Sequence, residues 1–241
     1  MPEKLEHSHD PSAIAARLAR GPRANYLPDA VYGAIDGTVT TFAVVSGVIG
    51  ADLSARIVLI LGAANLIADG FSMAAGNYTA SKAAAEQASR LRAQEERHIA
   101  LDAKGETDEV REIFRNKGYA GEALETLTRL VVSRRDVWID LMLSEEYGLA
   151  ASSRSPTWAA GVTFIAFASA GLVPLAPFAL GIANAPVIAI ALTAAVFVLI
   201  GSLKSRWSDR SWWASGLETL GIGLLAAAVA YMVGALLARL I

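Results

Sequence analysis

The sequence predicts an all-α membrane protein, with five transmembrane helices and a cytoplasmic helical domain inserted between the second and third spans. Its 241 residues are 54% hydrophobic, whereas a soluble domain contains roughly 45 to 50% apolar residues even with glycine counted. Five separate windows are apolar for the ~20 residues that a bilayer core requires. Charged residues are concentrated in positions 82–154, which are about 36% charged, against about 11% elsewhere.

The five windows divide the chain into membrane and non-membrane regions. They cover residues 29–50, 57–80, 156–176, 183–203 and 212–237. Positions 155–203 contain no charged residue, a stretch too long for one crossing. Four helix-breaking residues interrupt it: Pro174, Pro177, Gly181 and Pro186. We therefore expect spans 1 and 2 in residues 29–81 and spans 3 to 5 in residues 155–241.

Lysine and arginine predict the orientation, because cytoplasmic loops are enriched in them. The N-terminal tail (residues 1–28), the insert (residues 82–154) and the loop after the fourth span hold 19 of the 21 cationic residues. Only Arg56 and Arg239 lie on the other side. We expect the tail and the insert in the cytoplasm, with no cleavable signal peptide. A bacterial inner membrane is the expected location, and an organelle membrane stays open.

Charge and cysteine usage exclude several classes of function. The 21 Lys and Arg nearly balance the 23 Asp and Glu, so we expect no nucleic-acid partner. The absence of cysteine excludes disulfides, Cys-ligated zinc and iron–sulfur clusters. No P-loop or glycine-rich nucleotide motif occurs, which argues against ATP-driven pumping.

The insert is expected to be helical, because no proline occurs between the second and third spans. The second span has no stop signal before Gly105, so one continuous helix is expected over about residues 57–104. A further helix should begin at Asp108. Ser133-x-x-Asp136 resembles a capping box, which predicts the start of a last helix there.

Candidate metal ligands recur in the insert at spacings of three or four residues, so that each set shares one helix face. They are Glu95, His98, Glu106, Glu109, Glu112, Met142 and Glu146. Oxygen-rich sets with an occasional imidazole or thioether suit Mn²⁺ or Fe²⁺ better than Zn²⁺, which prefers more His or Cys. The alternative interpretation is the solvated face of a charged helix.

Two carboxylates fall inside the predicted spans, which is costly and typical of an ion pathway. Asp36 lies about two turns into the first span and Asp69 lies in the middle of the second. Asn65, Asp69 and Met73 are spaced by four residues and form one stripe. These oxygen and thioether groups can replace part of a divalent cation's hydration shell. For Met73, ordinary packing is the alternative.

Small residues bracket the first of these carboxylates. Gly33-x-x-x-Gly37 has the spacing that lets two helix backbones approach closely in a membrane. If the first spans of two copies pair through this face, Asp36 from both chains borders one pathway.

Three stretches together carry a family resemblance. They are residues 34–43 (AIDGTVTTFA), residues 69–78 (DGFSMAAGNY) and residues 138–149, which begin with WIDLM and end with EYGL. They resemble the vacuolar iron transporter (VIT) family. The match covers nearly the whole chain from about Arg20, in the same order of two spans, a helical insert and three spans.

The resemblance implies a homodimeric transporter that exports ferrous iron, and often manganese or cobalt, from the cytoplasm in exchange for protons. By position, Asp36 is then the pore aspartate and Met73 the pore methionine. The family's E-x-x-E pairs fall at Glu95-x-x-His98 and Glu106-x-x-Glu109, and Met142 and Glu146 complete that site. The transported metal is the only ligand expected, with no other cofactor.

Two residues depart from the family pattern. His98 stands where a glutamate is usual, which affects pH dependence because imidazole must be neutral to bind metal. Asn65 stands eight positions before Met73, where some members have glutamate, so Asp69 is the candidate for the membrane carboxylate.

The leading hypothesis is therefore a divalent-metal/proton antiporter and not an enzyme. One alternative is a membrane-anchored di-iron oxidase of ferritin type, which needs two Glu-x-x-His motifs and two further glutamates. Only Glu95-x-x-His98 qualifies, although a dimer supplies a second copy. The other alternative is a metal sensor, against which the polar stripe of the second span argues.

Overall fold

The computed structural model describes residues 7–21, 24–149, 154–205 and 210–240, and all secondary structure in these ranges is helical. Parts of the predicted tail and the end of the predicted insert, residues 150–153, lie outside them. Five segments are long and apolar enough to cross a membrane. They are Leu27–Gly50 (α2), Ala55–Leu101 (α3), Pro156–Ala179 (α7, η1 and α8), Ala185–Lys204 (α9) and Trp212–Leu240 (α10). The chain is a multi-pass membrane protein, and the five predicted spans are confirmed.

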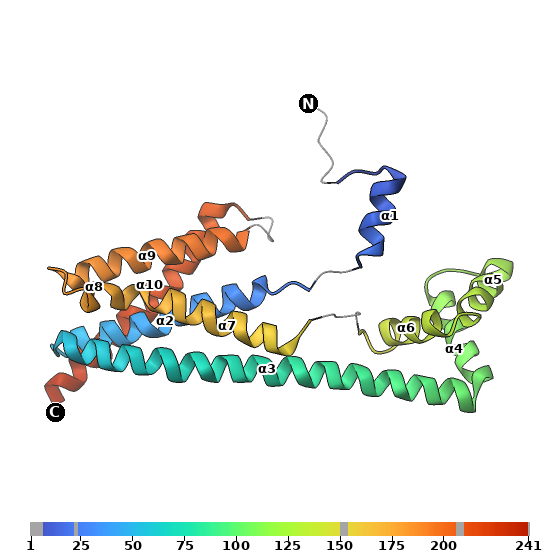
Figure 1. The fold of residues 1–241 in the computed structure, drawn as a ribbon, viewed down its shortest axis with the longest axis horizontal. Coiled ribbons are helices and arrows are strands. Elements are labelled where there is room, and N and C mark those ends of the chain that lie inside the picture. Colours follow the sequence, from blue (N-terminus) through green and yellow to red (C-terminus); the bar gives the residue numbers. More distant parts are fainter. Residues whose placement is uncertain (1–6, 22–23, 150–153, 206–209, 241) are drawn as a thin grey trace. The chain divides into compact units, whose positions relative to one another are not determined.

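The chain folds as two compact units (Figure 1). The membrane unit comprises Asn25–Thr79 and Arg154–Ile241, and the inserted unit comprises Met1–Ala24 and Ala80–Ser153. Helix α3 is continuous and contributes residues to both units. The predicted long helix is therefore confirmed, and it ends three residues earlier than expected.

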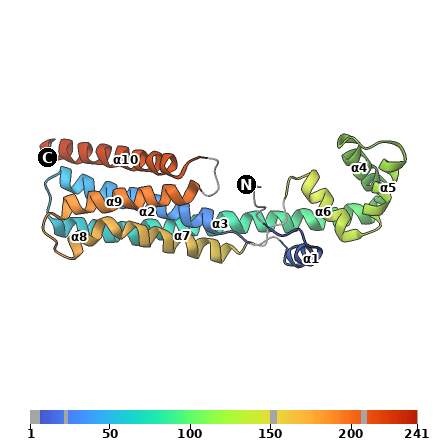
Figure 2. The same ribbon diagram turned by 90° about the horizontal axis from the view of Figure 1, so that it is seen from above.

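In the membrane unit, α2 packs along α7 and α10, and α10 also packs along α9 (Figures 1 and 2). The third span changes helix type as its prolines predict. Helix α7 (Pro156–Gly171) is followed by the 3-10 turn η1 (Val173–Leu175) and the short helix α8 (Ala176–Ala179). Each proline occupies one of the first two positions of its element, where its missing N–H costs no helical hydrogen bond.

Glycines allow the closest helix contacts of the membrane unit. A Cβ atom added at Gly33 would overlap the backbone of Thr163, and one added at Gly37 would overlap the backbone of Phe167. Both neighbours belong to α7, so this face of α2 is covered within the chain. The expectation that Gly33 and Gly37 pair the first spans of two copies is therefore wrong, because small residues serve intramolecular packing equally well.

A buried polar cluster joins α2, α3 and α7. The amide Nδ2 of Asn77 donates to Asp29 Oδ1 at 2.9 Å and to Thr163 Oγ1 at 2.7 Å. The guanidinium of Arg154 forms an ion pair with the other oxygen of Asp29. Asp29 is only 8% exposed, yet both of its oxygens have partners. This carboxylate holds helices together.

The inserted unit consists of the end of α3 with α4 (Ala103–Asn116), α5 (Gly121–Val132) and α6 (Arg135–Glu145). Its apolar core draws on all four helices: Ile99, Val110, Phe114, Leu124, Trp138, Ile139 and Met142. The short helix α1 (Pro11–Ala19) has no buried residue.

Two predicted helix starts in this unit are wrong. Helix α4 begins before Gly105, because the side chain of Asp102 caps it by accepting from the Gly105 N–H at 2.9 Å. Ser133 does not cap α6: it ends α5, and its hydroxyl donates to the Leu130 carbonyl at 2.7 Å. The N-cap of α6 is Arg134, which makes no capping hydrogen bond with its side chain.

Candidate metal centre

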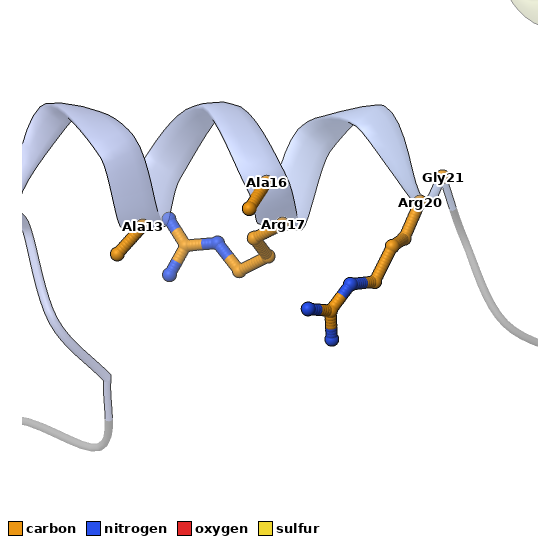
Figure 3. A pocket seen from close by; sticks show the side chains of 5 residues that line it. All are labelled: Ala13, Ala16, Arg17, Arg20 and Gly21. Carbon is orange, nitrogen blue, oxygen red and sulfur yellow. The ribbon is translucent and has the colours of Figure 1, made fainter.

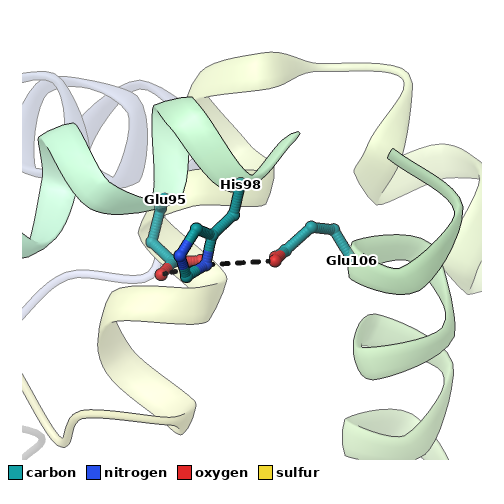
Figure 4. A group of neighbouring side chains, drawn as sticks. All are labelled: Glu95, His98 and Glu106. Carbon is teal, nitrogen blue, oxygen red and sulfur yellow. Dashed lines mark ion pairs between the residues drawn. The ribbon is translucent and has the colours of Figure 1, made fainter. Parts of the chain in front are cut away.

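Three of the predicted ligands come together in the inserted unit. Glu95 and His98 lie near the end of α3, and Glu106 lies in the first turn of α4, which the cap at Asp102 places directly after α3. Figure 4 shows the three side chains pointing toward one another from the two helices. One ligand atom from each lies within 4.8 Å of the other two.

The imidazole stands between the two carboxylates. His98 Nδ1 lies 3.3 Å from Glu106 Oε1 and 3.7 Å from Glu95 Oε1. The Glu95 side chain is fully buried and Glu106 is 6% exposed as a residue, whereas the His98 side chain is 44% exposed. The group therefore has a buried acidic side and an imidazole that solvent reaches.

Each buried carboxylate has one oxygen without a partner. Among the described residues, no hydrogen-bond donor contacts Glu95 Oε2 or Glu106 Oε2. Burying an ionised carboxylate without compensation is strongly unfavourable. Two ligand atoms that bind one cation, each at ~2.0–2.2 Å from it, lie at most about 4.4 Å from each other. A small contraction of this group would therefore provide a binding site for a divalent ion.

Electrostatics also favour a cation here. The pKa of Glu106 is raised to about 7: burial is the largest cause, the neighbouring Glu109 and Glu95 add to it, and His98 opposes them. Partial desolvation also raises the pKa of Glu146, a hydrogen bond from Tyr147 opposes this shift, and Glu95 and Glu109 add to it. Glu109 and Glu146 are thus electrostatic neighbours of the three-residue group. A divalent ion would relieve the repulsion among these carboxylates.

The remaining predicted ligands of the insert have other surroundings. Glu109 and Glu146 are exposed. Glu112 is exposed and forms an ion pair with Arg115. These surroundings fit the alternative interpretation, in which the residue belongs to the solvated face of a charged helix. Met142 is fully buried in the apolar core. The structure thus brings together Glu95, His98 and Glu106, and places Glu109 and Glu146 within electrostatic reach.

Tyr147 is a polar neighbour that sequence reasoning missed. Its hydroxyl donates to Glu95 Oε1 at 2.9 Å and accepts from Gln94 Nε2 at 3.3 Å. Burial raises its pKa, as do hydrogen bonds to Glu95 and Glu146, so the phenol stays protonated. The only available signal was its position, directly after the candidate ligand Glu146.

In the membrane unit, the polar residues of α2 and α3 face each other. Asn65 Nδ2 donates to Thr40 Oγ1 at 3.5 Å. Asp36 and Asp69 are close enough for their charges to interact. Both are half-buried. Met73 is half-buried and packs against the apolar cluster of this unit, which is its packing alternative.

Two observations bear on competing sites. The hollow on the surface of α1 is lined by Ala13, Ala16, Arg17, Arg20 and Gly21 (Figure 3). Its charged groups are both cationic, so it does not attract a metal ion. Within the part of the chain that the structure describes, one group of three His, Cys, Asp or Glu side chains has metal-binding geometry. The second Glu-x-x-His motif of a ferritin-type di-iron centre is not among these residues.

Comparison with known proteins agrees with this architecture. The model of the VIT family matches residues 27–235. Vacuolar iron transporter 1 of Eucalyptus grandis is 31% identical over 206 residues, which cover 84% of this chain and 83% of the relative. The vacuolar iron transporter of Toxoplasma gondii is 30% identical over 226 residues, with coverage of 89% and 75%. Vacuolar iron transporter 1 of Arabidopsis thaliana is 28% identical over 236 residues, with coverage of 95% and 91%. The chain belongs to the VIT family.

Proposed function

We propose that this protein transports divalent metal, Fe²⁺ and also Mn²⁺ or Co²⁺, out of the cytoplasm in exchange for protons. The observation that carries the proposal is the group of Glu95, His98 and Glu106, in which two buried carboxylate oxygens have no hydrogen-bond donor among the described residues. Oxygen donors with one imidazole suit Fe²⁺ and Mn²⁺. The relatives' names as vacuolar iron transporters support the same substrate.

The inserted unit is proposed to lie in the cytoplasm and to concentrate metal there. The distribution of Lys and Arg supports this side, because 19 of 21 lie on it. His98 is the exposed member of the group, so we propose that metal from the cytoplasm reaches the group from the side of this imidazole. Metal captured there would be released toward the membrane unit.

The transport step is proposed to use the polar residues between α2 and α3. Asp36 and Asp69 supply carboxylates, Asn65 an amide oxygen and Met73 a thioether. The interaction of the two aspartates supports a shared pathway. A proton and a metal ion compete for the same carboxylate, and this competition couples their opposite movements.

A homodimer belongs to the same proposal. Its interface must avoid the face of α2 at Gly33 and Gly37, because α7 covers that face. Helix α10 is the most exposed span, with 11% of its apolar window buried. It therefore offers a free surface for a second copy as well as for lipid.

Proteoliposome flux tests the proposal. The purified protein is reconstituted and Fe²⁺ and Mn²⁺ uptake is measured with and without a pH gradient. Asp36→Asn should abolish flux, because it removes the charge and keeps the shape. Asp52→Asn is the matched control: this exposed residue follows α2 with a φ of 56°, a conformation that asparagine tolerates.

Two results would contradict the proposal. Parental flux in Asp36→Asn would place the pathway elsewhere. Flux that does not respond to the pH gradient would rule out proton exchange.

A further inference from the structure

The hydroxyl of Tyr147 ties the segment after α6 to the metal group at the end of α3. It donates to Glu95 Oε1 at 2.9 Å, and it accepts from Gln94 Nε2 at 3.3 Å. Gln94 and Glu95 are adjacent on α3, so the phenol is held by two consecutive side chains. The tyrosine is not among the ligands that the sequence predicts.

The direction of these hydrogen bonds follows from the donor inventory. A phenol has one proton to donate, and Gln94 Nε2 is a donor only. The amide therefore occupies an acceptor site on the phenol oxygen, and the single hydroxyl proton is directed to Glu95. Glu146 also lies within hydrogen-bonding range of this hydroxyl, but one proton serves one carboxylate at a time.

The consequence for Glu95 is an unequal pair of oxygens. Oε1 has a hydrogen-bond donor, whereas Oε2 is buried without one among the described residues. A carboxylate fixed through one oxygen cannot turn freely about its last torsion. The carboxylate is then held beside the His98 imidazole before a cation binds, at no further cost in side-chain ordering.

We propose that Tyr147 is a positioning residue of the metal group, which fixes the Glu95 carboxylate beside His98 and so holds it in place for the ion. The inference rests on the proposed metal binding of Glu95, His98 and Glu106 and adds a determinant of its affinity. Tyr147 is proposed to act through Glu95 and not as a ligand, because its one hydroxyl proton is donated to Glu95 Oε1. Hydrogen-bond partners of metal ligands typically contribute 10–100-fold in affinity.

Equilibrium binding of Mn²⁺ to the purified full-length protein in detergent tests the inference. Tyr147→Phe removes only the hydroxyl and should weaken binding by roughly 10–100-fold. Tyr119→Phe is the matched control. Tyr119 lies in the same unit and packs edge-on against Phe114, so its variant should bind Mn²⁺ as the parent does.

A double-mutant cycle separates positioning from a general structural role. Glu95→Gln should weaken binding, and we expect His98, Glu106 and the nearby Glu109 to keep it measurable at millimolar Mn²⁺. If Tyr147 acts through Glu95, adding Tyr147→Phe to Glu95→Gln should change the Kd by less than about two-fold, because interacting residues are non-additive. Circular dichroism verifies that all variants are folded.

The outcomes are distinct. Parental affinity in Tyr147→Phe, or an equal loss in the Glu95→Gln background, would overturn the positioning role alone. A parent protein that binds no Mn²⁺ would overturn the proposed metal site, and this inference with it.

Discussion

The two units of the molecule both bury carboxylates, but they treat them differently. In the membrane unit, Asp29 has partners on both oxygens, Asn77 on one and Arg154 on the other. In the inserted unit, Glu95 and Glu106 are as deeply buried, and each keeps one oxygen without a donor among the described residues. Because an uncompensated buried charge is costly, the difference separates a carboxylate that joins helices from carboxylates that we propose bind a cation.

The two units also differ in how their helices pack. The membrane unit relies on glycines that bring backbones together, since lipid tails provide little hydrophobic drive between helices. The inserted unit relies on a core of larger apolar side chains such as Phe114 and Trp138. Substitutions that enlarge a side chain at these glycines should therefore lower the stability of the membrane unit more than similar substitutions lower that of the inserted unit.

The largest expected effect is on this packing. Gly37→Ala places a Cβ against the Phe167 backbone, which cannot move as a side-chain tip can. We expect destabilisation of about 3 kcal/mol, since overpacking typically costs 1–3 kcal/mol and occasionally more. Thermal unfolding in detergent measures it. The control is Gly76→Ala, where an added Cβ would meet no other described atom within 4 Å beyond the backbone of its own helix. Equal melting temperatures for the two variants would contradict the contact between α2 and α7.

Neutralising the two kinds of carboxylate should change the stability of the metal-free protein in different directions. Asp29→Asn removes the ion pair with Arg154 and weakens the polar contacts that join these helices, so it should lower stability by roughly 2 kcal/mol. Glu106→Gln removes a buried charge in the metal-free protein and should raise stability or leave it unchanged. Melting temperatures measured without metal test both. If Glu106→Gln destabilises the metal-free protein as much as Asp29→Asn does, the contrast between the units is wrong.

The smallest effect concerns pH. The pKa of Glu106 is raised from 4.5 to about 7. The protonated Glu106 carboxyl favours the metal-free fold. Its contribution to stability is fully present below pH 4.5 and is lost as the pH rises through 7. Metal binding has the opposite dependence, because the proton must leave first: Mn²⁺ affinity should rise up to about tenfold per pH unit, or 1.4 kcal/mol, until pH 7 and then level off. Calorimetry from pH 5.5 to 8.5 measures it, and an affinity independent of pH would exclude Glu106 as a ligand.

Much of the fold was predictable from the sequence, because membrane spans can be recognised by their length and by the absence of charged residues. The five spans and the continuous α3 follow from hydropathy and from the lack of proline. The helix starts did not follow, because Asp102 and Ser133 are both plausible caps by residue type. Only tertiary structure decides that Asp102 caps α4 while Ser133 ends α5.

The site was predictable in part. Helical spacing placed Glu95 and His98 on one face of α3, but it could not show that Glu106 on another helix would approach them. Nor could spacing separate Glu106 from Glu112, which pairs with Arg115 at the surface. The glycines at positions 33 and 37 predicted a close helix contact, but the sequence did not show that the partner helix is α7.

Titration of the purified full-length protein with Mn²⁺ most directly tests whether Glu95 and Glu106 form a cation site. Electron paramagnetic resonance reports the free ion in the parent, in the Glu95→Gln, Glu106→Gln double variant, and in the surface control Glu112→Gln. The parent and the control should bind Mn²⁺ equally, and the double variant should lose at least about 100-fold in affinity, because two charged ligands are removed. Binding by the double variant within two-fold of the parent would show that the metal is held elsewhere.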